Sequence, residues 1–293
     1  MKKYFSLIRL KQWIKNFFVF APLLFSKHLF EIEYFYKAFI AFLSFCFVSS
    51  SVYVINDIID REKDKLHPKK KLRPIASGQI GLLQAFLILF IFLVSSILTS
   101  LKLNYKIAII IAFYFVLNFS YSFWLKNIVI LDIMTISVGF ILRVIAGGEA
   151  IDVKISNWLI LSTFFISIFL AAMKRRSELA LFENNDLLTR KVLSEYSTYF
   201  ADLIGVISAS ALLISYALYT INENTIEYFG NDYIFYSNIF AAFGIFRFMY
   251  LSYKKSKGEN ATEVMLTDLP MMINLILYVL FIIFVVYYSR LIK

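Results

Sequence analysis

The chain has 293 residues, of which 60% are hydrophobic, and its mean hydropathy is +0.72. These values exclude an ordinary soluble domain, whose apolar share is about 45–50%. The net charge is +10, from 30 Lys and Arg against 20 Asp and Glu. A lone cysteine, Cys46, excludes an intramolecular disulfide and a cysteine cluster for a metal. The composition therefore predicts a membrane protein.

The N-terminal segment, MKKYFSLIRLKQWIKNFF, is basic but lacks a clean apolar region followed by a small-residue cleavage site. We therefore do not expect a removable signal peptide. Long apolar runs follow, such as AFLILFIFLVSSILTSL from Ala85. Such runs are about long enough to cross a 30 Å hydrocarbon core at 1.5 Å per residue, and none alternates with the period of a barrel strand. The chain is therefore predicted to be an all-α, polytopic membrane protein.

Nine membrane spans are predicted in chain order, in a single domain covering residues 1–293. Their approximate ranges are 13–27, 36–56, 82–100, 105–123, 129–148, 155–174, 200–220, 232–252 and 269–289. The first is the weakest, because Lys15 and Asn16 lie inside it and Pro22 interrupts it. It is expected to lie partly in the membrane interface.

The distribution of basic residues predicts the orientation of these spans. The loops on the N-terminal side carry 22 of the Lys and Arg residues, and the loops on the opposite side carry seven. Because Lys and Arg concentrate in short cytoplasmic loops, we expect the N-terminus and the 57–81 and 174–199 loops to face the cytoplasm. The positive net charge is then mostly a matter of topology and of attraction to anionic lipid, and no nucleic-acid partner is expected.

The most polar stretch is NDIIDREKDKLHPKKKLRPIASG, residues 56–78. Asp57, Asp60 and Asp64 would share one face of a helix, and Asn56 could reach the same surface. Three crowded carboxylates need a compensating cation, and hard oxygen ligands suit Mg²⁺ held against substrate phosphates. The basic residues that follow could bind the remaining anionic oxygens; they are Lys69, Lys70, Lys71 and Arg73. The competing interpretation is a solvated loop whose acids balance its bases.

The same stretch resembles the first aspartate-rich motif of the UbiA-type intramembrane prenyltransferase superfamily, NDxxDxxxD with an RPIASG-like tail. The resemblance implies nine transmembrane helices around a central cavity open to the cytoplasmic side, with this motif at the end of the second helix. Four further segments resemble one subgroup, the decaprenyl-phosphate phosphoribosyltransferases. They are RLKQWIKNFFVFAPLLFS, YSFWLKNIVILDIMTISVGFILRVIAGG, AAMKRRSELALF and GENATEVMLTDLP.

One departure from the wider superfamily is informative. Members that use prenyl diphosphates usually carry a second aspartate-rich motif near the end of the sixth helix, where this chain reads KRRSELALFENND. This segment supplies Lys174, Arg175 and Glu178 as predicted substrate contacts. A basic cluster there is expected to bind phosphate directly.

Arg143 is costly within an apolar span, so it is predicted either to clamp a phosphate or to serve as a paired structural arginine. Further predicted substrate contacts are Gln12, Lys15, Tyr121 and Lys126. His67, before Pro68, is interpreted as a turn residue. Asp268 is expected to be either a helix N-cap or a substrate ligand.

The resemblance implies Mg²⁺-dependent transfer of 5-phosphoribose from phosphoribosyl pyrophosphate to a polyprenyl phosphate, at the inner membrane of a bacterial-type cell. The acidic residues Asp57, Asp60 and Asp64 would hold the metal and the departing pyrophosphate. The acceptor is already an anion, so no general base is needed. Two alternatives remain: a prenyltransferase with an aromatic or glyceryl-phosphate acceptor, and a lipid transporter. The missing second motif disfavours the former, and charges confined to one membrane face disfavour the latter.

Overall fold

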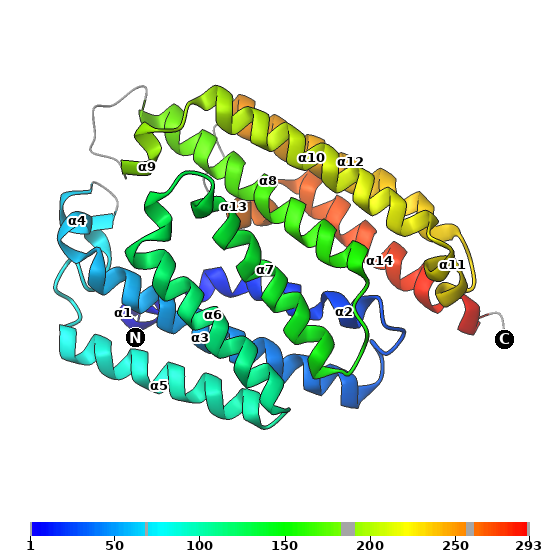
Figure 1. The fold of residues 1–293 in the computed structure, drawn as a ribbon, viewed down its shortest axis with the longest axis horizontal. Coiled ribbons are helices and arrows are strands. Elements are labelled where there is room, and N and C mark those ends of the chain that lie inside the picture. The colour runs from blue at the N-terminus through cyan, green and yellow to red at the C-terminus, as the bar shows by residue number, and fades with distance from the viewer. Residues whose placement is uncertain (1, 68–69, 183–190, 256–260, 292–293) are drawn as a thin grey trace. The chain divides into compact units, whose positions relative to one another are not determined.

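The computed structural model describes residues 2–67, 70–182, 191–255 and 261–291, and every regular element among them is a helix (Figure 1). Within these described ranges, eight segments are long and apolar enough to cross a membrane. They comprise α3 (Ile32–Ile59), α5 (Leu82–Leu101), α6 (Tyr105–Phe123), α7 (Leu131–Ala150), α8 (Asn157–Phe182), α10 (Thr198–Ile221), α12 (Asn238–Lys255) with the preceding η4 (Tyr233–Ser237), and α14 (Leu269–Leu291). The shorter helices are α1 (Lys2–Leu7), η1 (Leu10–Phe20), α2 (Ala21–Leu24), α4 (Arg61–Leu66), η2 (Lys70–Leu72), η3 (Leu125–Asn127), α9 (Lys191–Ser194), α11 (Glu223–Phe229) and α13 (Ala261–Thr267).

The all-α fold is confirmed, and these eight segments match eight of the nine predicted spans. The exception is the first, 13–27, which forms the 3₁₀ helix η1 followed by the short α2 and is not among the eight segments. Pro22, which has no N–H for an i→i−4 bond, is the second residue of α2. The count of nine spans is therefore not confirmed.

The contacts divide the chain into two compact units. Unit 1 comprises residues 1–23, 28–126 and 142–154, and in it α3 packs lengthwise against α5 and also contacts η1 and α6. Small hydroxyl side chains lie at the α3–α5 contact: Ser96 Oγ donates to the Ser44 carbonyl at 2.7 Å, and Ser51 Oγ donates to the Leu89 carbonyl at 3.2 Å. Small residues of this kind let helix backbones approach closely where lipid supplies no hydrophobic driving force.

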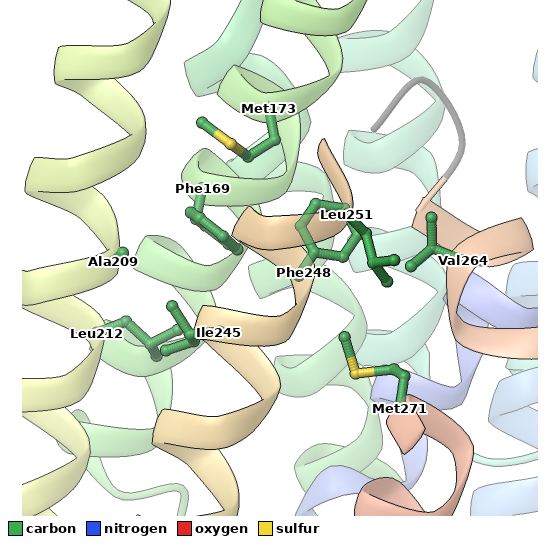
Figure 2. Packing of buried hydrophobic residues seen from close by; sticks show 9 residues of the cluster. All are labelled: Phe169, Met173, Ala209, Leu212, Ile245, Phe248, Leu251, Val264 and Met271. Atoms are coloured by element: carbon green, nitrogen blue, oxygen red, sulfur yellow. The ribbon is translucent and has the colours of Figure 1, made fainter. Parts of the chain in front are cut away.

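Unit 2 comprises residues 24–27, 127–141 and 155–293, and its main contact is the lengthwise packing of α8 on α10. Figure 2 shows the apolar core that these helices share with α12, α13 and α14. Phe169 of α8 meets Phe248 of α12 edge to face, with ring centroids 5.6 Å apart. Such aromatic pairs add about 0.5–1.5 kcal/mol beyond the area that they bury.

The helix α7 contributes to both units, because unit 2 holds its residues up to Ile141 and unit 1 holds those from Leu142. Within unit 1, the backbone of η1 passes directly over Gly147 of α7. A Cβ built on Gly147 would lie 2.0 Å from the carbonyl oxygen of Val19. Only glycine permits this approach, which brings the polar side chains of η1 to α7.

Candidate active site

The acidic stretch of unit 1 lies where α3 ends. Asp57 is in the last turns of α3, Asp60 stands at the junction with α4 in a turn conformation (φ −86°, ψ 5°), and Asp64 is in α4. Asp57 and Asp64 are buried, whereas Asp60 is partly exposed. The expectation of one continuous helix face is therefore wrong in detail, because the helix is interrupted at the middle aspartate. The interruption separates the three carboxylates into a pair and a single group.

The pair is bridged by an arginine from the basic part of the same stretch. Arg73 Nη1 lies 3.1 Å from Asp57 Oδ1 and 2.6 Å from Asp64 Oδ2, so one nitrogen serves two carboxylates. Arg9, at the start of η1, also donates to Asp57 Oδ1, and its guanidinium stacks 4.8 Å from the centre of the Tyr53 ring. The pair therefore lies between two arginines.

The single group, Asp60, is held by Lys126 of η3. Lys126 Nζ lies 2.9 Å and 3.2 Å from the two carboxylate oxygens of Asp60. With Arg9 and Arg73 on the other two aspartates, three acids meet three cations, and the group is formally neutral. Buried acids require such compensation, because an unpaired charge in a low dielectric is costly.

These residues can accommodate a divalent cation in part. In the described ranges, no three His, Cys, Asp or Glu side chains come together as a metal-binding group. Asp57 and Asp64 nevertheless converge on one positively charged nitrogen, and their hard oxygens are the donors that Mg²⁺ prefers. Since Mg²⁺ is typically bound by one or two carboxylates plus substrate phosphates, the pair suffices for it. A direct metal contact from Asp60 stays a prediction.

A second polar group of unit 1 surrounds the buried Arg143 of α7. Arg143 Nε donates to Asn16 Oδ1 at 2.8 Å, and Nη2 donates to the Tyr114 hydroxyl at 2.8 Å. The guanidinium also lies 4.8 Å from the Tyr114 ring centre and 5.5 Å from that of Phe45. These contacts describe a structural arginine, and the alternative role as a phosphate clamp stays a prediction.

Lys15, next to Asn16 in η1, lies in a positively charged environment. Burial, followed by the positive charges of Arg143 and Arg9, lowers the pKa of the Lys15 ammonium to about 8. A cation held among other cations is a site where an anion would be stabilised. Gln12 of η1, Asn56 of α3 and Tyr121 of α6, the other predicted contacts in unit 1, are each half-buried.

In unit 2, the basic cluster of α8 is largely neutralised by acids. Arg175 is 2% exposed; its Nε lies 2.8 Å from Asp132 Oδ2 and its Nη1 lies 2.6 Å from Glu178 Oε2. Lys174 is 44% exposed and lies 3.7 Å from Glu178 Oε1. Lys174 is therefore the more accessible of the two predicted phosphate contacts, and Arg175 is held within the protein.

Asp132 and Tyr196 extend the polar network around Arg175, and the sequence reasoning did not identify them. Tyr196 lies just before α10, and its hydroxyl donates to Asp132 Oδ1 at 2.8 Å and accepts from the Ile130 N–H at 2.9 Å. Burial raises the pKa of the Tyr196 hydroxyl, so it remains a donor to the carboxylate. Ile130 has a left-handed backbone (φ 71°), which is costly for a β-branched residue. The one feature of the sequence that could have pointed to this network is Asp132, an acid in the first turn of the apolar helix α7.

Hydrogen bonds confirm the N-cap role of Asp268 and the turn role of His67, and a substrate role for Asp268 stays a prediction. Asp268 is the N-cap of α14, since its Oδ1 accepts the Met271 N–H at 3.1 Å, and it also forms two bonds with Arg247. His67 is a turn residue whose Nδ1 accepts the Lys70 N–H at 3.2 Å. Lys69, one of the predicted phosphate contacts, lies outside the described residues.

The fold agrees with comparisons to known proteins. The model of the UbiA prenyltransferase family matches residues 17–276, and the chain belongs to this family. It is therefore a multi-pass membrane protein of a transferase family.

Among curated relatives, a decaprenyl-phosphate phosphoribosyltransferase of Mycolicibacterium smegmatis is 38% identical over 74% of this chain and 70% of its own length. One from Mycobacterium tuberculosis is 32% identical over 74% of this chain and 73% of its own length. A solved UbiA homologue from Archaeoglobus fulgidus, bound to DMAPP and Mg²⁺, aligns with a TM-score of 0.70 at 18% identity, covering 97% of this chain and 99% of the homologue.

Proposed function

We propose that this protein transfers a 5-phosphoribosyl group from phosphoribosyl pyrophosphate to a polyprenyl phosphate and releases pyrophosphate, in a reaction that depends on Mg²⁺. The relatives in Mycolicibacterium and Mycobacterium bear the name of this activity and match about three quarters of the chain. The observation that carries the choice of donor is the composition of α8. This helix bears Lys174 and Arg175. By the superfamily resemblance, members that use prenyl diphosphates usually carry aspartates at this place.

The donor carries phosphate at both ends of its sugar, and the cations of unit 1 suit these groups. Arg9 and Arg73 present planar guanidinium groups that can bind two phosphate oxygens at once, whereas Lys126 acts as a point charge. Asp57 and Asp64 would hold the divalent cation, which neutralises charge on the departing pyrophosphate when it is bound. The predicted contacts of Gln12, Asn56 and Tyr121 would orient the sugar and its phosphates.

The reaction exchanges one C–O bond for another at the anomeric carbon. The bond between C1 and the pyrophosphate oxygen breaks, and pyrophosphate leaves with the electron pair. An oxygen of the polyprenyl phosphate then provides the electron pair of the new C1–O bond. No proton has to be removed from the acceptor, because a phosphate monoester is already anionic, so the chain needs no catalytic base. As the bond breaks, the sugar resembles an oxocarbenium ion, as in glycoside transfer. Direct displacement inverts the anomeric configuration.

The lipid acceptor is suited to the apolar helices of the chain. Many large hydrophobic side chains of the described helices are exposed, among them Phe86 and Phe90 of α5 and Ile276 of α14. A polyprenyl tail can lie against such surfaces while its phosphate stays at the depth of the polar residues. By the distribution of Lys and Arg, we assign that depth to the cytoplasmic face of a bacterial-type inner membrane.

The direct test is an assay on the protein purified in detergent. It is incubated with Mg²⁺, radiolabelled phosphoribosyl pyrophosphate and polyprenyl phosphate, and the organic phase is counted. Label in the organic phase, lost when EDTA is added, supports the proposal. Transfer only from a prenyl diphosphate to an aromatic acid would overturn it.

A further inference from the structure

We propose that Arg73 is a built-in counter-cation that occupies the divalent-cation position between Asp57 and Asp64 and leaves it only when phosphate groups arrive. The metal and the diphosphate would then bind together, and neither would bind tightly alone. This inference rests on the proposed function, because it concerns how the same site takes up its charged ligands.

The guanidinium of Arg73 lies between the two carboxylates that would hold a metal ion. One nitrogen, Arg73 Nη1, lies within 3.1 Å of an Asp57 oxygen and 2.6 Å of an Asp64 oxygen. These oxygens come from two different helices, α3 and α4, and this nitrogen is their shared partner. A divalent cation coordinated by both carboxylates cannot occupy the same point, and the positive guanidinium would repel it. Metal binding therefore requires the Arg73 side chain to move.

The balance of charges also indicates that the metal does not bind tightly alone. Asp57, Asp60 and Asp64 are matched by Arg9, Arg73 and Lys126, so the group is neutral as it stands. A divalent cation alone would leave two uncompensated positive charges beside buried carboxylates, which is unfavourable in a low dielectric. A diphosphate that arrives with the metal compensates them. Such coupling is reciprocal, so the diphosphate must tighten metal binding by the same factor that the metal tightens diphosphate binding.

Arg73 is the member of the cluster best placed to move. It follows the short helix η2 and precedes Pro74, outside the regular helices, and its side chain is 26% exposed, against 2% for Asp57. Its backbone is fixed by bonds from its N–H to the Lys70 carbonyl and from the Ser77 N–H to its own carbonyl. The side chain alone can therefore swing while the loop stays in place. Arg175 of unit 2 also bridges two acids but is buried in α8, and we assign it no such movement.

A guanidinium released from the carboxylates is well suited to the incoming ligand. Its planar fork matches two phosphate oxygens, and charge-assisted bonds of this type are stronger than neutral ones. Arg73 would thus exchange two carboxylate contacts for phosphate contacts, and Asp57 and Asp64 would take the metal.

The test measures cation binding rather than turnover. Protein-bound Mn²⁺, used as a probe for the divalent cation, is measured by equilibrium dialysis and electron paramagnetic resonance on the full chain in detergent, with and without inorganic pyrophosphate. For the wild type we expect weak binding of Mn²⁺ alone and at least tenfold tighter retention with pyrophosphate. Stoichiometric, tight binding of Mn²⁺ without pyrophosphate would overturn the inference on the unmodified protein.

The variant Arg73→Gln removes the counter-cation. It should bind Mn²⁺ alone at least tenfold more tightly than the wild type and show a smaller effect of pyrophosphate. Lys63→Gln is the matched control, because Lys63 is exposed on α4 in the same stretch and the charge change is the same. Adding Asp64→Asn to Arg73→Gln should abolish the tighter binding of Mn²⁺, since it removes one of the two carboxylates.

An Arg73→Gln protein that binds Mn²⁺ no better than the wild type would refute the counter-cation role. If the wild-type protein nevertheless transfers phosphoribose, only this inference fails and the proposed function stands. A wild type that retains no Mn²⁺ under any condition contradicts both the inference and the metal-dependent reaction. Should Arg73→Gln fail to fold, the wild-type measurement and Arg73→Lys, expected to keep the weak binding of Mn²⁺ alone, still decide the question.

Discussion

Arg143 and Asn16, which are 127 positions apart in the sequence, are joined by a 2.8 Å hydrogen bond inside unit 1. The bond exists because η1 lies against α7 at Gly147, one turn beyond Arg143. The amide nitrogen of Asn16 in turn donates to Ser49 and to the sulfur of Cys46 in α3. A polar side chain of η1 therefore links two long helices of the unit.

Replacing Gly147 by alanine should disrupt this link. The new methyl group would lie 2.0 Å from a backbone carbonyl that no side-chain rotation can relieve. We expect a loss of about 1–3 kcal/mol in stability, the usual range for overpacking, and a drop of several degrees in the melting temperature in detergent. Gly81→Ala is the control, because a Cβ at Gly81 meets nothing within 4 Å. Equal melting temperatures for the two variants would contradict the close approach.

Asp60→Ala should abolish turnover while leaving expression and folding intact. The Asp60 side chain is partly exposed, so its loss removes little packing, but it leaves the Lys126 ammonium without its carboxylate beside the proposed donor site. We expect activity to fall by about 10²-fold or more, as for other electrostatic contacts to a reacting group. The label-transfer assay measures this, and Glu62→Ala serves as control because Glu62 is 74% exposed in the same stretch. Full activity of Asp60→Ala would remove the role assigned to this residue.

The lowered pKa of Lys15 predicts a pH dependence. A lysine with a pKa of about 8 is mostly protonated at pH 7 and loses its charge as the pH rises through 8. If Lys15 contacts a substrate phosphate, the KM for phosphoribosyl pyrophosphate should rise between pH 7 and 9, because Lys15 loses its positive charge. The phosphates themselves are already ionised over this range, so their titration does not cause the change. Lys15→Arg should flatten the profile, since arginine stays protonated. A wild-type KM that is constant across this range would argue against an anion contact at Lys15.

The buried network of unit 2 predicts unequal costs for two conservative changes. Asp132→Asn leaves the buried Arg175 without one of its two acids, and breaking a buried pair from one side costs about 3–5 kcal/mol. Tyr196→Phe removes one hydroxyl and leaves the Ile130 N–H without it, at a cost of about 1–3 kcal/mol. In thermal unfolding in detergent, the melting temperature of Asp132→Asn should therefore be lower than that of Tyr196→Phe, and both should be lower than that of the wild type. The reverse order would show that Arg175 does not depend on Asp132.

The long helices could be predicted from the sequence because an apolar run of about 20 residues has one stable conformation in a bilayer. The same physics does not specify residues 13–27, where Lys15, Asn16 and Pro22 break the run. The 3₁₀ conformation of η1 depends on tertiary contacts, such as that between Val19 and Gly147, which no local pattern records.

For the site, the spacing of Asp57, Asp60 and Asp64 predicted one helix face, whereas the structure has these residues at the end of α3, at the junction and in α4. It did not predict the partners, because Arg9 and Lys126 are brought to it by the packing of η1 and η3. Asp132 and Tyr196 were missed for a related reason: their contact spans 64 positions, which no local pattern records.

The left-handed Ile130 has a consequence for how the chain is made. The backbone that precedes α7 is held in this conformation by a tyrosine hydroxyl from residue 196, which leaves the ribosome 66 residues later. During co-translational insertion, α7 can enter the bilayer, but its first turn cannot settle until the start of α10 has been synthesised. Final maturation of this helix therefore comes only after the next span, α8, has been synthesised.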